Sequence, residues 1–510
     1  MNLSDIVKQG AINHPQRPAL IYANSVTTYT ELAQKVEHFA QELRRLGVLP
    51  GDRVALLLPN CPLFVVAYYA AVSIGAIVVP ANPMLKPAEL AYLWNDAGVS
   101  VVFTISALEP VVSIAKENVL TLQHVFAFPA DIDPHTVSLA PTPPVSSLLE
   151  QNETTREAED ENTCAVILYT SGTTGFPKGA MLSHKNLCRN VEQVRAFLHF
   201  TSEDVFLTVL PLFHVFAATV CLHVCLSGGS ACVLVPQFSP GAMFENIEKH
   251  KISIFCGVPS IFGAMLMHKS EREPDLSSLR FFVSGGAPLP GATLQALESR
   301  FGVPVLEGDG PTECSPVTSV NPQHGVRKIL SVGPALPGVE VKIFDDNDTE
   351  LPPDEIGEIV VRGDNVMLGY LNRPEETAEA MKGGWYHTGD LGKIDEDGYI
   401  FIVDRKKDMV ITGGLNVYPR EVEEVLASHG AVGGCAVIGL LDALRGEEVV
   451  AVIVKKPGTE VTERELILFC RERLANYKVP RRVIFREVLP LGASGKVVKR
   501  LLKKELEQEV

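Results

Sequence analysis

The sequence predicts an α/β protein with a large N-terminal domain at residues 1–404 and a small C-terminal domain at residues 405–510. Strand-like and helix-like segments alternate from Ala19 onward, which is typical of mostly parallel sheets flanked by helices. From about Val332 the composition turns to Gly, Pro and Asp with short β-runs, which indicates a small β-rich part at about 332–404. The last hundred or so residues predict a separate α+β unit, and 510 residues exceed what one ordinary core holds.

The first hundred residues show the alternation most clearly. Ala19–Tyr22 and Val26–Tyr29 predict a hairpin about Asn24–Ser25, and we expect Thr30 to cap the helix that follows. Further strands are expected at Val54–Leu58, Ile77–Val79 and Val101–Thr104, with helices that begin at Pro62 and Pro87.

Later segments continue the pattern. Residues 128–163 are rich in proline and then acidic, and predict a surface connection. Strands are expected at Cys164–Tyr169, Val205–Leu210, Ala231–Val235, Ile252–Cys256, Phe281–Ser284 and Val303–Glu307. In the C-terminal domain, Thr462 and Glu465 predict the capping box of a helix.

Composition and charge exclude several classes of protein. With 46% hydrophobic and 21% charged residues, the chain has the composition of a soluble globular protein. A net charge of −16 argues against nucleic acid as a general partner. The ten cysteines form no CxxC pair, and the alternating Cys221, His223 and Cys225 favour core packing over a metal site. Reduced thiols and the lack of a signal-peptide pattern predict a cytoplasmic protein.

Two long uncharged stretches raise the alternative of a membrane span. One runs from Val54 to Leu85 and the other lies between Asp204 and Glu245. Prolines, among them Pro80 and Pro211, divide both stretches into strand and helix lengths. We therefore expect a buried core and no integral membrane segment.

The segment Tyr169–His184, YTSGTTGFPKGAMLSH, is the most specific feature of the chain. It follows a predicted strand and precedes a helix that Ser183 can cap. Its hydroxyl residues, glycines and lysine suit a phosphate chain: Thr170, Ser171, Gly172, Thr173, Thr174, Gly175, Lys178 and Gly179. The spacing differs from a Walker A loop, and a solvent-exposed polar turn is the alternative.

Further motifs follow in a fixed order. They are Pro211–His214, Ser284–Pro288, Glu307–Glu313, Trp385–Asp390, Val403–Leu426 and Ser494–Lys496. Together with Tyr169–His184 they resemble the adenylate-forming superfamily of acyl-CoA synthetases, peptide-synthetase adenylation domains and luciferase. The resemblance covers nearly the whole chain and is closest to bacterial medium- or long-chain fatty acyl-CoA synthetases. It implies a C-terminal domain that turns between two half-reactions, about a hinge at Lys407.

The resemblance assigns a role to each motif. The implied catalytic residues are Lys496, His214, Lys178 and Thr312, and Glu313 is the implied Mg²⁺ ligand. The implied nucleotide site comprises Thr170, Ser171, Gly172, Thr173, Thr174, Gly175, Lys178, Gly286, Ala287, Glu307, Gly308, Asp309, Thr312, Asp390, Arg405 and Lys496. The implied acyl pocket comprises His214, Phe216, Gly285, Gly286 and Pro316, and the implied coenzyme A tunnel Gly413 and Gly414.

Two positions depart from the family pattern. An aromatic residue usually stands at the position of Asp309, and an aliphatic one is common at that of Pro311. Stacking of the adenine on a side chain at residue 309 is therefore in question.

The implied activity is an ATP-dependent carboxylic acid–CoA ligase. It consumes ATP, Mg²⁺ and coenzyme A, and forms an acyl-adenylate before the thioester. The substrate is expected to be a medium- or long-chain fatty acid, with an aryl or aryl-propenoate acid as the alternative. Two other functions are compatible with the motifs. The chain could load its acyl group onto the phosphopantetheine of a carrier protein, or it could be a nucleotide-binding regulator without catalysis. A homodimer is compatible with the sequence.

Overall fold

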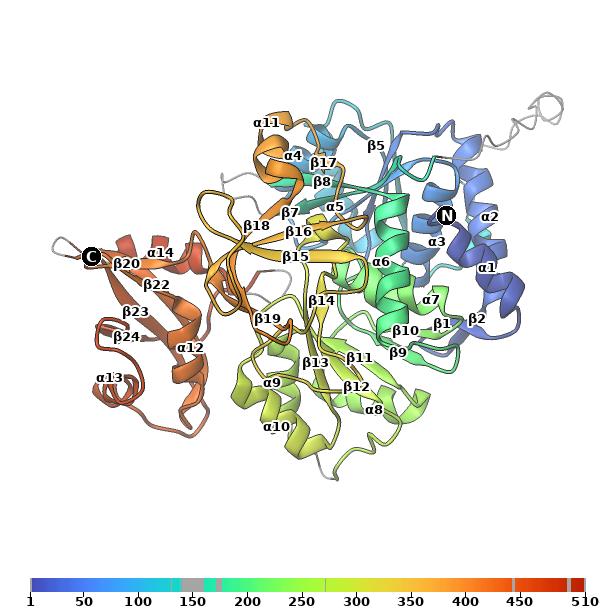
Figure 1. Ribbon diagram of the computed structural model, residues 1–510. Helices are drawn as coiled ribbons and strands as arrows, with labels where there is room; N and C mark the ends of the chain where they lie inside the picture. Colours follow the sequence, from blue (N-terminus) through green and yellow to red (C-terminus); the bar gives the residue numbers. More distant parts are fainter. Residues whose placement is uncertain are drawn as a thin grey trace, which may run out of the picture.

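The computed structural model describes residues 2–129, 131–137, 139, 160–170, 177–270, 272–442, 445–492 and 497–508 (Figure 1). It is an α/β protein with a separate C-terminal domain, as predicted. The helices are α1 (Asp5–Asn13), α2 (Tyr29–Arg45), α3 (Pro62–Ser73), α4 (Pro87–Ala97), α5 (Glu109–Lys116), α6 (His184–Phe197), α7 (Cys225–Ser227), α8 (Pro240–His250), α9 (Pro259–Met267), α10 (Gly291–Phe301), α11 (Pro374–Ala380), α12 (Pro419–Ala427), α13 (Glu463–Arg471) and α14 (Lys499–Gln508). A π-helix, η4 (Ala217–Val224), precedes α7, and short 3₁₀ turns include η5 (Thr312–Cys314).

An eight-stranded sheet forms one half of the large domain. Its strands from β13 to β1 run parallel, and the two edge strands β14 and β2 are antiparallel. In spatial order they are β14 (Ser319–Val320), β13 (Val305–Asp309), β12 (Phe281–Ser284), β11 (Ile254–Gly257), β9 (Val205–Thr208), β10 (Ala231–Leu234), β1 (Pro18–Tyr22) and β2 (Ser25–Thr28).

A seven-stranded sheet forms the other half. Strands β7 to β6 run parallel, and β8 is antiparallel to both of its neighbours, β7 and β17. In spatial order they are β17 (Gly369–Tyr370), β8 (Lys178–Ser183), β7 (Cys164–Thr170), β4 (Ile77–Pro80), β3 (Arg53–Leu57), β5 (Val99–Ile105) and β6 (His124–Phe128).

Two smaller sheets complete the molecule. The predicted β-rich part is an antiparallel sheet of β15 (Val339–Phe344), β16 (Gly357–Gly363), β18 (Tyr386–Ile394) and β19 (Ile400–Arg405). The C-terminal domain contains β20 (Val410–Thr412), β21 (Leu415–Val417), β22 (Val432–Asp442), β23 (Gly446–Lys455) and β24 (Arg482–Phe485). The predicted capping box of Thr462 and Glu465 is present at the start of α13.

The seven-stranded sheet is covered on both faces, because successive side chains of β3 pack into two different cores. Val54 and Leu56 pack in the main core with α3, whereas Ala55 and Leu57 pack with α4 and α5. Helix α3 is buried from Leu63 to Ser73 because it lies inside the main core. Figure 1 shows α9 and α10 beside β13 on the side nearer α12, and α8 beside β12 on the opposite side.

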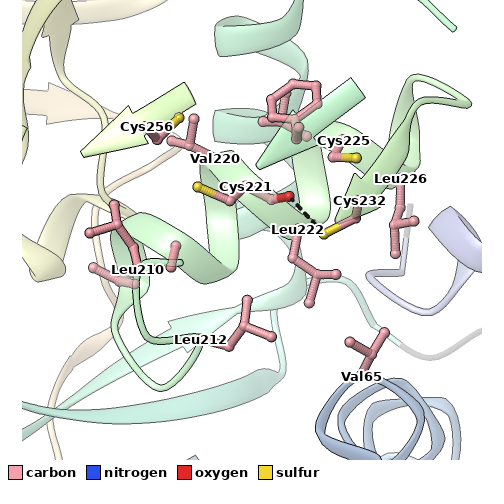
Figure 2. Close-up of a cluster of buried hydrophobic side chains, with 14 of the residues drawn as sticks. Val65, Leu210, Leu212, Val220, Cys221, Leu222, Cys225, Leu226, Cys232 and Cys256 are labelled. Carbon is pink, nitrogen blue, oxygen red and sulfur yellow. Dashed lines mark hydrogen bonds between the residues drawn. The ribbon is translucent and has the colours of Figure 1, made fainter. Parts of the chain in front are cut away.

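The uncharged stretches lie in this core. Cys221, Cys225, Cys232 and Cys256 form a buried apolar cluster with neighbouring leucines and valines (Figure 2). His223 is also fully buried, and its Nδ1 is hydrogen-bonded to the Tyr69 hydroxyl at 2.7 Å. Burial lowers the pKa of His223 to about 3. Among the described residues no cluster suits a metal ion, and none of the described helices has the length and apolarity to cross a membrane.

One local prediction is wrong, and one strand was missed. Thr28, not Thr30, caps α2, because the Thr28 hydroxyl and the Glu31 carboxylate form a reciprocal capping box, while the Thr30 hydroxyl donates to Pro15. Ser183 caps α6 as predicted, but strand β8, which was not predicted, lies between β7 and this helix and pairs antiparallel with β7.

Candidate active site

Three of the predicted motifs meet at the carboxyl end of the eight-stranded sheet. Because β9, β12 and β13 are parallel, the segments that follow them emerge at the same edge. Ser284 at the end of β12 is paired with Glu307 near the end of β13. Pro211–His214 follows β9, Gly285–Gly286 follows β12, and Gly308–Asp309 completes β13. The sheet therefore brings the predicted acyl and adenine segments together.

The predicted acyl segments are in contact through Phe216. A Cβ atom built at Gly285 would lie 3.2 Å from the Phe216 ring, so residue 285 must be small. His214 is half-buried, and its Nδ1 accepts a hydrogen bond from the Phe216 amide at 3.3 Å. Gly286 has φ +77°, a left-handed conformation that suits glycine, and Ala287 follows it.

The segment after β13 turns tightly around Pro316. A Cβ atom at Gly310 would lie 1.6 Å from the Pro316 carbonyl oxygen, so only glycine fits. Thr312 and Glu313 belong to η5, and Glu313 is buried. The Met367 amide donates to the Glu313 carbonyl at 2.7 Å and fixes this turn against the strand region of residues 366–371.

The β7–β8 hairpin reaches the same place from the seven-stranded sheet. Thr170 and Lys178 are the last paired residues before the loop that connects the two strands of the hairpin. The Thr170 hydroxyl donates to Glu313 Oε1 at 3.4 Å, and the Tyr370 hydroxyl donates to the same oxygen at 2.9 Å. Lys178 Nζ lies 5.3 Å from the centroid of the Tyr370 ring. The phosphate-type segment and the predicted metal carboxylate are thus neighbours.

Asp390 and Arg405 form the next part of the site. They are cross-strand partners on β18 and β19, and Arg405 Nε lies 2.7 Å from Asp390 Oδ1. Burial opposes the charge of Arg405, but Asp390 and then Asp309 outweigh it and raise the pKa of the guanidinium. The side chain of Arg405 is half-exposed and can still meet a ligand.

Glu307 lies beneath this region and contacts the C-terminal domain. Its Oε1 accepts a hydrogen bond from the Leu289 amide at 2.9 Å and lies 3.9 Å from Arg420 Nη2 on α12. Burial raises the pKa of Glu307 to about 7, although Arg420 and the Leu289 amide favour its charged form. Helix α12 makes a second contact, since the Gly291 amide donates to Glu424 at 3.2 Å.

The remaining predicted residues either lie outside the described part of the chain or belong to the C-terminal domain. Ser171, Gly172, Thr173, Thr174, Gly175 and Lys496 lie outside the described residues. Gly413 and Gly414 form the β20–β21 turn with φ +60° and +78°, and Figure 1 shows β20 on the side of the small domain away from β13. Lys407 is exposed between β19 and β20.

The donor set fits the groups that the motifs imply. The carboxylate of Glu313 is a hard oxygen ligand of the kind that Mg²⁺ prefers, and Thr312 supplies a hydroxyl for a phosphate oxygen. Lys178 supplies a cation for phosphate oxygens, and Asp390 supplies acceptors for vicinal hydroxyls.

Two functional candidates were missed from the sequence. Tyr370 connects Lys178 with Glu313, and Arg420 connects the two domains through Glu307. Arg420 lies inside the Val403–Leu426 motif, but no local signal marks either side chain.

The fold and the convergence of these groups define a two-domain α/β enzyme that uses a nucleotide. Residues 7–371 match the family model described as AMP-binding enzyme, and residues 421–496 match the AMP-binding enzyme C-terminal domain. The chain belongs to this family and is an AMP-forming acid–CoA ligase, a class that uses ATP, Mg²⁺ and coenzyme A.

Full-length relatives support the assignment. The chain is 38% identical to a long-chain-fatty-acid–CoA ligase of Bacillus subtilis, over 99% of this chain and 95% of the relative. It is 39% identical to a feruloyl-CoA synthase of an Amycolatopsis species, over 95% of each. ATP-bound MatB from Rhodopseudomonas palustris is 32% identical, with a TM-score of 0.89 over 99% of both chains. Apo MatB gives a TM-score of 0.79 at the same coverage, so the present arrangement resembles the ATP-bound form more.

Proposed function

We propose that this ligase activates a medium- or long-chain fatty acid. The observation that carries the proposed site is that Thr170 and Lys178 of the β7–β8 hairpin lie near Glu313 of η5, which follows the other sheet. A cation and a carboxylate able to bind a metal thus lie near the loop between β7 and β8. The sequence of that loop is rich in glycine and hydroxyl residues, which suits a phosphate chain. The relatives named as long-chain-fatty-acid–CoA ligases support the substrate class.

The proposed first half-reaction joins the acid to AMP. A carboxylate oxygen of the acid attacks the α-phosphorus of ATP, the bond to the bridging oxygen breaks, and pyrophosphate leaves. Lys178 and Thr312 contact the phosphates, while Asp390 and Arg405 hold the ribose. Glu313 would hold Mg²⁺, which offsets phosphate charge when bound.

The proposed second half-reaction transfers the acyl group. The thiolate sulfur of coenzyme A attacks the carbonyl carbon of the acyl-adenylate, and AMP leaves. We assign Lys496 to the first half-reaction and Gly413–Gly414 to the thiol path of the second. The domain boundary at 404/405 and the hinge at Lys407 follow from this division, because the small domain must turn between the two steps.

The acyl pocket is assigned to His214, Phe216, Gly285, Gly286 and Pro316. Phe216 packs against Gly285, so the reactive end of the acid would lie beside an aromatic ring. The buried, apolar helix η4 follows at once and is compatible with an alkyl tail.

A panel of acids tests this function. Pyrophosphate release is measured with fatty acids of increasing chain length and with aryl-propenoates, each with and without coenzyme A. We expect release with medium- or long-chain acids and formation of their CoA thioesters. Preference for an aryl-propenoate would support the second candidate substrate, which the feruloyl-CoA synthase relative favours. Acid-dependent release without a CoA thioester would favour a carrier-protein acceptor.

We also place the enzyme in the cytoplasm. All ten cysteines are free thiols, which suits a reducing compartment. Fractionation of the producing cells tests this location. Recovery of the activity outside the cytoplasmic fraction would contradict it.

A further inference from the structure

Tyr370 touches two oppositely charged groups of the site. Its hydroxyl donates to Glu313 Oε1 at 2.9 Å, and its ring lies beneath Lys178 Nζ at 5.3 Å from the centroid. The first contact is a hydrogen bond to a charged acceptor, and the second is a cation–π contact. One side chain thus contacts the proposed phosphate-binding cation and the proposed metal ligand.

The backbone of Tyr370 is fixed by two neighbours. Residue 370 pairs with Ala180 on β8, and the Leu371 amide donates to the Gly179 carbonyl at 2.8 Å. The Tyr370 amide donates to the hydroxyl of Thr377 at 2.9 Å, which closes the free edge of β17. The ring therefore projects from a strand that is bonded to the same hairpin that carries Lys178.

This arrangement keeps the ammonium and the carboxylate apart. Among the described residues, Lys178 and Glu313 form no ion pair within 4.0 Å, although both approach Tyr370. A direct pair would satisfy each charge with the other and reduce the attraction of both to phosphate and metal. Instead, the Glu313 carboxylate accepts a hydrogen bond from the Tyr370 hydroxyl, and the Lys178 ammonium lies over the face of the Tyr370 ring.

The phenol is the donor in its contact with Glu313, because an ionised carboxylate oxygen can only accept a hydrogen bond.

We propose that Tyr370 is a positioning residue of the adenylation step. Its hydroxyl holds one oxygen of Glu313 and its ring holds the Lys178 ammonium, so that the two charges stay separate and available to a metal–ATP complex. The inference rests on the proposed roles of Lys178 and Glu313 and adds the residue that orients them.

Tyr370→Phe tests the hydroxyl alone, because the ring remains. Mn²⁺, which electron paramagnetic resonance detects, replaces Mg²⁺ and is titrated onto the full chain in the presence of a non-hydrolysable ATP analogue. We expect the half-saturating Mn²⁺ concentration to rise about tenfold, the loss typical of one hydrogen bond to a charged group. An unchanged or lower concentration would overturn the proposal.

Tyr399→Phe is the matched control. Tyr399 also lies beneath a lysine, with Lys328 Nζ 4.6 Å from its ring centroid, and its hydroxyl donates to the Val326 carbonyl at 2.6 Å. It is away from Glu313, so we expect wild-type Mn²⁺ binding. An equal loss in both variants would show a general effect on the fold and contradict a specific role for Tyr370.

Two further variants complete the test. The double variant Glu313→Gln/Tyr370→Phe should bind Mn²⁺ no more weakly than Glu313→Gln alone. If the two substitutions weaken Mn²⁺ binding additively, Tyr370 does not act through Glu313. If Tyr370→Phe does not fold, Glu313→Asp withdraws the carboxylate from the phenol by one methylene, and wild-type Mn²⁺ binding by that variant overturns the proposal.

Failure of the proposed function gives a different result. In that case the wild-type chain releases no pyrophosphate with any fatty acid, while the comparison of Mn²⁺ binding between Tyr370→Phe and Tyr399→Phe still decides the role of Tyr370.

Discussion

Asp390 and Arg405 show how much of the site depends on single side chains. Their cross-strand pairing sets a carboxylate and a guanidinium side by side, and Arg405 stays half-exposed. Asp309 adds a second negative charge near Arg405, since it also raises the pKa of the guanidinium. The position at which the family pattern led us to expect an aromatic residue thus contributes charge in this chain.

Asp309→Tyr tests whether a ring at this position helps to bind the base. We expect the KM for ATP to fall about fivefold, because stacking of a base on an aromatic ring contributes about 1 kcal/mol or more. Asp309→Asn is the control that removes the charge without adding a ring. If the two variants have the same KM for ATP, the base does not lie against residue 309.

The order of the motifs predicted which side chains carry chemistry, but not how they are connected. Tyr370 and Glu313 are 57 residues apart, and Thr170 and Glu313 are 143 apart, yet all three meet at one carboxylate oxygen. Such contacts depend on how two sheets pack, and no local pattern in the chain records that. The roles of these residues in catalysis stay predictions.

Whole strands were predicted more reliably than the turns between them. Apolar runs such as Cys164–Tyr169 and Phe281–Ser284 are strands because both faces of their sheets are covered. Strand β8 was missed because it is short and begins with Lys178 and Gly179, which have the composition of a loop. Its pairing with β7 means that a strand lies between the residues after Thr170 and the N-terminus of α6.

Gly179→Val should disturb this hairpin. A Cβ atom at Gly179 would lie 2.8 Å from Ile167 and 3.3 Å from Tyr169, so overpacking should cost about 1–3 kcal/mol of the free energy of unfolding. We expect a lower Tm and a higher KM for ATP. Gly263→Ala, in α9 and with no atom within 4 Å of the new methyl group, should leave both unchanged or raise the Tm. A Gly179→Val variant with wild-type Tm and KM would show that the hairpin tolerates a side chain there.

The two domains are joined by a buried charged contact as well as by the chain. Arg420 and Glu424 of α12 reach Glu307 and Gly291 of the large domain. The second oxygen of Glu307 and Nη2 of Arg420 are buried with no hydrogen-bond partner among the described residues. The contact is therefore sensitive to the protonation of Glu307.

Glu307→Gln should change how stability depends on pH. Because the pKa of Glu307 is raised to about 7 in the folded chain, the folded state holds a proton that the unfolded state releases above about pH 4.5. The wild-type chain should thus be most stable relative to the variant at or below pH 4.5. That advantage should decline between pH 4.5 and 7, by on the order of 3 kcal/mol. Thermal unfolding of both proteins across this range is the measurement, and parallel curves would contradict the shift.

The most direct test of a site shared between two domains is to measure the two half-reactions separately in Lys496→Ala. We expect acid-dependent pyrophosphate release to slow by orders of magnitude, because the cation that we assign to the developing charge is lost, while a presynthesised acyl-adenylate is still converted to its CoA thioester. Lys504→Ala, an exposed lysine of α14, should leave both rates unchanged. Equal losses in the two half-reactions of Lys496→Ala would contradict the division of labour between the domains.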